Sequence, residues 1–139
     1  MMYLLDTNVI SELRKLTSGR AHPNVVQWSA THPLTQCHLS TVTVKELEYG
    51  LLLVGRRDPD QGWRLRDWVE QVIRDFTDRT FPIDTTIARR AARLHVPDPA
   101  PEADAYIAAT ALVHDLTLVT RNTTHFTRFD SVTIANPWD

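Results

Sequence analysis

The sequence of 139 residues is poor in cysteine and glycine and has no long apolar run. Its single cysteine, Cys37, cannot form an internal disulfide or a multi-cysteine metal site, and its 4 Gly and 8 Pro are too few for a fibrous or low-complexity chain. No apolar stretch reaches the roughly 18–20 residues of a membrane span, and Asp6 lies where a secretory signal would carry basic residues. We therefore expect a soluble, cytoplasmic protein that does not bind membranes.

The composition is that of one globular domain spanning residues 1–139. Hydrophobic residues make up 42% and charged residues 23%, and a chain of this length can fold without a disulfide or metal. The net charge of −2 argues against nucleic-acid binding by overall electrostatic attraction. It leaves open a nuclease in which metal ions face the phosphate. All 15 basic residues except Lys15 and Lys45 are arginine, which can bind phosphate through two hydrogen bonds.

Apolar runs alternate with helical patterns along the chain. The runs predict strands at Tyr3–Leu5, Cys37–Thr41, Phe81–Ile83, Leu116–Thr120 and Val132–Ile134. Helices are predicted at 9–16, 22–32, 44–54, 61–77, 84–94, 102–115 and 122–126. This alternation predicts an α/β fold, a three-layer sandwich with a central parallel sheet of about five short strands flanked by helices.

The helix predicted at 44–54 has the clearest local start signals. Thr43 and Glu46 fit a capping box, and Val42 and Leu47 fit the hydrophobic staple that often accompanies it. Gly55 fits the residue that ends the helix. In the helix that follows, Trp63 and Trp68 lie on an amphipathic segment and are expected to face the core or a dimer interface.

Four oxygen-bearing side chains are predicted at the carboxyl ends of strands, where parallel sheets bind ligands. They are Asp6, Glu46, Asp104 and Asn122. Each also has a purely structural interpretation, since Asp6 and Asn122 could cap helices, Glu46 fits the capping box and Asp104 could complement a helix dipole. Together, however, the carboxylates would repel each other by roughly 4 kcal/mol at about 4 Å and an effective dielectric near 20. A hard cation with oxygen ligands, Mg²⁺ or Mn²⁺, would relieve this repulsion and favour phosphodiester cleavage.

An ordered set of segments spanning nearly the whole chain resembles a known family. The segments are Leu5–Glu12, Ser40–Leu47, Ala103–Ala111, Val119–Thr123 and Asn136–Trp138. They look like those of a PIN-domain ribonuclease of the VapC toxin type, from toxin–antitoxin systems. The resemblance implies a PIN-like fold, a metal-dependent endoribonuclease, inhibition by a cognate VapB-type antitoxin and a homodimer.

By this resemblance, Asp6, Glu46 and Asp104 are the metal-binding acidic residues. They would hold Mg²⁺, with Mn²⁺ as the alternative, and an activated water would hydrolyse the RNA. Asn122 completes the predicted catalytic set, but many relatives have a fourth Asp there, so binding of a second ion is left open. Thr7 is expected beside the first acid as a hydroxyl donor.

Further candidates surround this predicted centre. Thr120 is expected to donate a hydrogen bond behind the metal ligands. Arg14, Lys15 and Arg121 are candidate contacts to RNA phosphates, and His125 is a weaker one. For these residues an ordinary solvated-surface role remains open.

Three alternatives to the ribonuclease make different demands on the sequence. A haloacid-dehalogenase-like phosphatase would need a second Asp where this chain has Asn8. A response-regulator receiver would need a Lys after a late strand, and both Lys residues precede position 46. The remaining alternative is a catalytically weak PIN-like module that binds RNA or a partner protein.

Overall fold

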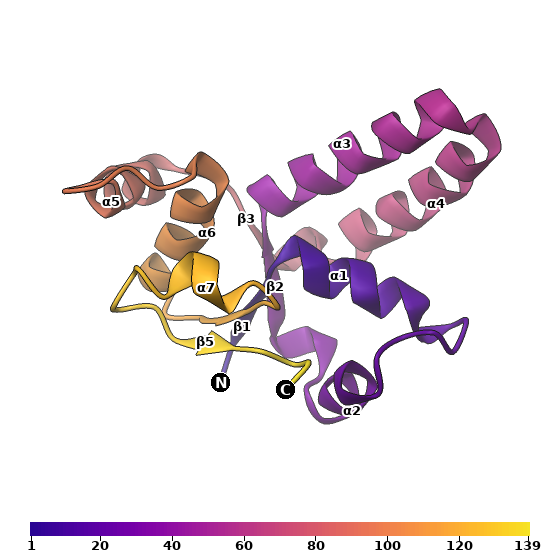
Figure 1. Ribbon diagram of the computed structural model, residues 1–139, viewed down its shortest axis with the longest axis horizontal. Helices are drawn as coiled ribbons and strands as arrows, with labels where there is room; N and C mark the ends of the chain where they lie inside the picture. The colour runs from indigo at the N-terminus through magenta and orange to yellow at the C-terminus, as the bar shows by residue number, and fades with distance from the viewer.

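The computed structural model describes residues 1–139 and has a five-stranded sheet at its centre. The strands are β1 (Tyr3–Leu5), β2 (Cys37–Ser40), β3 (Thr80–Phe81), β4 (Thr117–Val119) and β5 (Ile134–Ala135). Their order is β3-β2-β1-β4-β5 and every neighbouring pair is parallel. The predicted parallel α/β sheet of about five short strands is therefore confirmed (Figure 1).

Seven α-helices flank the sheet and make it the middle of three layers (Figure 1). They are α1 (Thr7–Leu13), α2 (Pro23–Thr31), α3 (Thr41–Arg57), α4 (Pro59–Asp75), α5 (Thr85–Leu94), α6 (Glu102–Val113) and α7 (Thr123–Phe126). Short 3-10 turns lie at Arg14–Leu16, Leu34–Gln36 and Thr77–Arg79. Helices α1 to α4 lie on one side of the sheet, and α5 to α7 lie on the other.

The core is divided by the sheet because successive strand side chains point to opposite faces. Leu5 packs in a cluster with α1, α3 and α4, whereas its neighbour Leu4 packs with α6 and α7. Trp68 is partly buried against the first cluster, as predicted, but Trp63 is 62% exposed. No helix of the protein is long and apolar enough to cross a membrane.

Helix α3 begins earlier than the capping box predicted. It starts at Thr41, and the side chain of Ser40 accepts a hydrogen bond from the backbone N–H of Val42. Thr43 is buried and its hydroxyl has no partner, so it does not act as the cap. The prediction was wrong because the polar residue that ends β2 is already placed to cap the helix.

Helix α3 also continues past Gly55, which was predicted to end it. It runs to Arg57, and Asp58 then accepts a hydrogen bond from the N–H of Gln61 to begin α4. Gly55 lies inside α3 and faces Gly62 of α4. Gly55 therefore allows α3 and α4 to pack closely in this hairpin, and it does not form a turn. At β3, the strand ends at Phe81, because Pro82 has no N–H to donate to a ladder.

Candidate active site

Asp6 follows β1 directly, and its carboxylate is held by several hydrogen bonds. The side chain is 7% exposed. Its Oδ1 accepts from the backbone N–H of Thr7 at 2.9 Å. Its Oδ2 accepts from the hydroxyl of Thr120 at 2.8 Å and from the amide of Asn8 at 3.3 Å. Because β1 and β4 are neighbours, the donors that follow each strand meet on this one carboxylate. Asp6 therefore has a fixed orientation.

Glu46 reaches the same region from the second turn of α3. Its Oε1 accepts a hydrogen bond of 2.7 Å from the hydroxyl of Thr7. Thr7 thus links the first and second acidic residues: its backbone N–H contacts Asp6 and its hydroxyl contacts Glu46. Helix α3 leaves β2 next to β1, and this topology brings Glu46 to Thr7 across 39 residues of sequence.

Asp104 lies in the first turn of α6, where the negative charge of Asp6 acts on its carboxyl group. Burial raises the pKa of Asp104, the charge of His125 lowers it, and the like charge of Asp6 raises it again. The Nδ1 of His125 lies 3.9 Å from Oδ2 of Asp104. The acidic centre therefore comprises a fixed Asp6, a partly buried Asp104 and a Glu46 held through Thr7.

Asn122 is exposed, and its side chain forms no hydrogen bond. Its backbone N–H donates to the hydroxyl of Thr120 at 3.0 Å. Asn8 is the polar residue that sequence reasoning missed as part of the site. Its amide donates to Asp6 and to the hydroxyl of Thr120, and its Oδ1 accepts from the N–H of Arg121 at 3.1 Å. Its position two residues after Asp6 was the available signal.

The basic candidates for substrate contact lie in two places. Arg14 and Lys15 line a cavity of about 820 Å³ together with Arg20, Gln61 and Trp68. Within it Arg14 lies over the Trp68 ring, and Lys15 pairs with Glu12 at 3.1 Å. Arg121 instead follows β4, and its guanidinium lies over the ring of Trp138.

The donor chemistry of the acidic centre fits a hard divalent cation. Asp6, Glu46 and Asp104 offer only oxygen atoms, which suit Mg²⁺ or Mn²⁺ rather than Zn²⁺. The mutual repulsion of Asp6 and Asp104 would be relieved by a cation between them. No group of three His, Cys, Asp or Glu side chains is close enough to hold a metal ion as the chain stands. Protein carboxylates would therefore supply part of the coordination, and water or substrate oxygens the rest.

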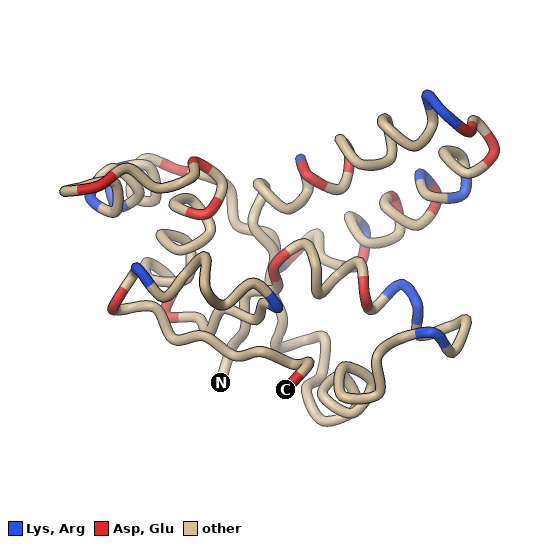
Figure 2. Tube along the Cα trace, viewed as in Figure 1, with Lys and Arg blue, Asp and Glu red and all other residues tan.

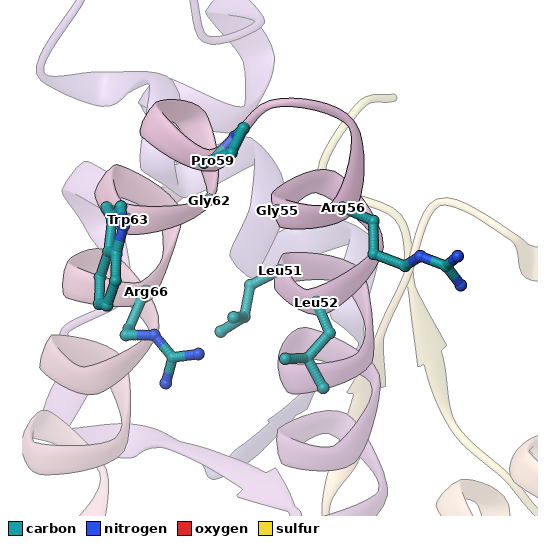
Figure 3. Close-up of a pocket in the computed structure, with 8 residues that line it drawn as sticks. All are labelled: Leu51, Leu52, Gly55, Arg56, Pro59, Gly62, Trp63 and Arg66. Atoms are coloured by element: carbon teal, nitrogen blue, oxygen red, sulfur yellow. The ribbon is translucent and has the colours of Figure 1, made fainter.

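Two further hollows lie near α3. One, of about 440 Å³, is lined by residues adjacent to the acidic ones, including Lys45, Ala103 and Tyr106. The other, of about 320 Å³, lies on the α3–α4 hairpin between Leu52 of α3 and Trp63 of α4 (Figure 3). The first hollow is lined mainly by residues of α3 and α6, whereas the second offers exposed apolar side chains.

Comparison with known families assigns this fold to a family. The family described as PIN domain matches residues 3–132. This chain belongs to the PIN-domain family. The match covers Asp6, which follows β1, as well as the helices that carry Glu46 and Asp104. The family resemblance seen in the sequence is thereby confirmed.

Relatives of this PIN domain occur in several bacteria. It is 40% identical over 147 aligned residues to Toxin FitB of Neisseria gonorrhoeae and 35% identical over 145 to VapC ribonuclease Y4jK of Sinorhizobium fredii, covering 99% of each chain in both cases. Its structure resembles that of FitAcB from N. gonorrhoeae, with a TM-score of 0.87, 36% identity and 99% of both chains covered. A toxin–antitoxin complex from Klebsiella pneumoniae matches with a TM-score of 0.67 and 30% identity, covering 99% of this chain and 98% of that one.

Proposed function

We propose that this PIN domain is a metal-dependent endoribonuclease and the toxin of a toxin–antitoxin pair. The observation that carries the proposal is the position of Thr7, whose backbone N–H donates to the carboxylate of Asp6 and whose hydroxyl donates to that of Glu46. Relatives that cover the whole chain and are named toxin and VapC ribonuclease support the reaction class. The donor chemistry suits hydrolysis of a phosphodiester rather than chemistry that needs a nucleophilic side chain.

Asp6, Glu46 and Asp104 are the residues that would hold the cation, Mg²⁺ first and Mn²⁺ as the alternative. When bound, such a cation activates water for attack on the phosphorus and neutralises charge on the phosphate oxygens. Thr120 and Asn8 keep Asp6 in one orientation, and Thr7 does the same for Glu46. Fixed ligands of this kind lose little free energy to reorganisation when the cation and substrate arrive.

In this proposal, the remaining candidate residues bind or orient the RNA substrate. Asn122 offers an unpaired neutral amide after β4, where it can orient water or a phosphate oxygen. His125, beside Asp104, can donate a proton or a hydrogen bond to the substrate. Arg14, Lys15 and Arg121 can contact backbone phosphates.

A protein partner and a second copy of the chain complete the proposed function. The exposed apolar side chains of α3 and α4, including Tyr49, Leu52, Leu53 and Trp63, favour contact with another protein. We assign the hairpin hollow to a VapB-type antitoxin, in line with the related toxin–antitoxin complex, and expect a homodimer. An antitoxin arginine placed between Asp6 and Asp104 would replace the charge of the cation and block the site.

Replacement of Asp104 tests the proposal. Asp104→Asn should reduce magnesium-dependent cleavage of end-labelled RNA at least about a hundredfold, because the amide cannot supply the ligand charge. Asp67→Asn, an exposed carboxylate on the outer side of α4, is the matched control and should cleave normally. A co-purified antitoxin should abolish wild-type cleavage in the same assay.

Two other results would change the assignment. Undiminished magnesium-dependent cleavage by Asp104→Asn would remove Asp104 from the catalytic set. RNA binding by the wild type without any magnesium-dependent product would favour the catalytically weak binding module instead.

A further inference from the structure

Helix α5 presents a row of arginines beside the carboxyl end of α6. Thr86, Arg89, Arg90 and Arg93 follow the i, i+3, i+4, i+7 spacing of one helix face. The buried face, with Ile87 and Ala91, packs against α6. Figure 2 shows the basic residues on α5, whereas acidic residues lie at the start of α6. The arginines therefore lie beside the helix contact and do not form it.

These side chains border a cavity of about 230 Å³. It is lined by Thr85, Thr86, Arg89, Arg90, Arg93 and Val113, and we call it the α5 arginine pocket. It contains three guanidinium groups and two hydroxyls but no carboxylate. None of the three arginines forms an ion pair or a side-chain hydrogen bond within the protein. Their hydrogen-bond donors are thus available to a ligand.

Three like charges on adjacent turns destabilise a helix modestly. The carboxyl end of α6, near Val113, offsets part of this repulsion with its partial negative charge. A multiply charged anion would offset much more of the repulsion among the arginines, because each guanidinium group can donate two parallel hydrogen bonds to phosphate oxygens. The lining therefore selects an anion with several oxygen acceptors.

Such a site would add affinity for RNA to the proposed ribonuclease. The chain carries a net charge of −2, and the acidic centre repels the RNA backbone wherever a cation does not neutralise it. Affinity for RNA must then come from local clusters of basic residues. The α5 arginine pocket is a cluster whose charges are not used inside the protein.

We propose that the α5 arginine pocket binds a backbone phosphate of the RNA substrate at a distance from the acidic centre. This inference rests on the proposed function and extends it. Asp104 lies near the start of α6 and Val113 at its end, nine residues apart, which corresponds to about 14 Å along the helix. At about 3.4 Å per stacked nucleotide, about four nucleotides separate the two positions.

Fluorescence anisotropy of labelled RNA, measured with the full chain, tests the pocket. Metal-free buffer is used because it prevents cleavage of the RNA during the measurement. The double variant Arg89→Gln/Arg93→Gln should bind a single strand of about 20 nucleotides on the order of tenfold more weakly. The slope of log affinity against log salt should fall by about 0.7, the value for one lost phosphate contact on single strands. Arg57→Gln/Arg64→Gln removes the same charge from exposed positions on the α3–α4 hairpin and should change both values little.

A three-nucleotide RNA provides the second control, because it is too short to reach both positions and the acidic centre repels it in metal-free buffer. Its binding should therefore be weaker in the α5 variant than in the wild type. Equal loss in the α5 and hairpin variants, for either RNA, would overturn the pocket and leave only general charge attraction. Unchanged binding of the long RNA by a folded α5 variant would also overturn it.

Inorganic phosphate distinguishes RNA from a free anion as the ligand. At constant ionic strength, millimolar phosphate should displace little of the long RNA if the pocket is built for the backbone. Complete displacement from the wild type, with none from the α5 variant, would assign the pocket to free phosphate and overturn the RNA proposal.

Arginine-dependent RNA binding by a wild type that never cleaves would keep the pocket and reject the proposed enzyme. If the wild type cleaves RNA but its RNA binding does not depend on these arginines, the pocket would be rejected and the proposed enzyme kept.

Discussion

His38 is a titratable side chain enclosed in the second strand of the sheet. It is 5% exposed, its Nδ1 lies 3.3 Å from the carbonyl oxygen of Tyr3, and its ring stacks on Phe81. The ring of His114 stacks on the same Phe81, with centroids 3.7 Å apart. Burial lowers the pKa of His38, the Tyr3 carbonyl raises it, and the charge of Arg79 lowers it again, with a net shift downward.

This lowered pKa makes stability depend on pH. The unfolded chain, with a His pKa near 6.5, takes up a proton at His38 more readily than the folded chain. The contribution is therefore fully present above about pH 6.5 and is lost as the pH falls below it. In urea unfolding, the wild type should lose more free energy of unfolding between pH 7.5 and 5.5 than His38→Asn, whose amide can still donate to Tyr3. Equal losses in the two proteins would show that His38 does not contribute to the pH dependence.

Residue identities at the acidic centre were predictable from the sequence only in part. Asp6, Glu46 and Asp104 became candidates because each was predicted to follow a strand or open a helix at one end of the sheet. Asn8 was not, since its contact with Thr120 spans 112 residues and depends on the β1–β4 pairing. Local patterns identify candidate groups, but hydrogen bonds between distant segments require the fold.

The hairpin of α3 and α4 depends on the close approach of Gly55 and Gly62. A Cβ built on Gly62 would lie 2.6 Å from the Cα of Gly55, too close for any real contact. A Cβ on Gly55 would meet the Cα of Gly62 at an ordinary 3.8 Å, and one on Gly50 would have open space. Figure 3 shows both glycines of the crossing between the two helices. Gly62 is therefore the position at which a side chain would force the helices apart.

Alanine substitutions at these glycines should have opposite effects. Gly62→Ala should lower the free energy of unfolding by about 1–3 kcal/mol, because backbone must shift to admit the methyl group. Gly50→Ala, in the open part of α3, should raise it by about 0.5–1 kcal/mol through helix propensity. Urea unfolding of both variants beside the wild type measures the contrast. Stabilisation by Gly62→Ala would mean that the hairpin is looser than the structure describes.

At the level of elements, apolar periodicity was a good guide to the strands and helices and a poor one to their ends. The capping box at Thr43 and Glu46 was a valid local signal, but Ser40 starts the helix because β2 ends there. Gly55 likewise suggested a helix end, although α4 packs so closely that a glycine is used inside α3. In both cases tertiary packing decided between two local possibilities.

At the scale of the whole molecule, the fold brings the three candidate acidic residues toward one end of the parallel sheet. Strands β1, β2 and β4 all point the same way, so Asp6, the helix that carries Glu46 and the loop with Thr120 leave the sheet at one edge. Asp104 joins them from α6 on the far side of the sheet. Burial and the charge of Asp6 raise the pKa of Asp104, so its ionised form costs folding free energy at neutral pH.

The free-energy cost of the ionised Asp104 predicts how the melting temperature depends on magnesium. In metal-free buffer, Asp104→Asn should melt at the same temperature as the wild type or higher, because a disfavoured charge is gone. A cation that binds only the folded chain, at about a hundredfold its Kd, adds about 2.7 kcal/mol, equivalent to several degrees in Tm. Magnesium should therefore raise the Tm of the wild type and of Asp67→Asn but raise that of Asp104→Asn much less. An equal rise in all three proteins would mean that the ion acts elsewhere on the surface and that the acidic centre does not bind it.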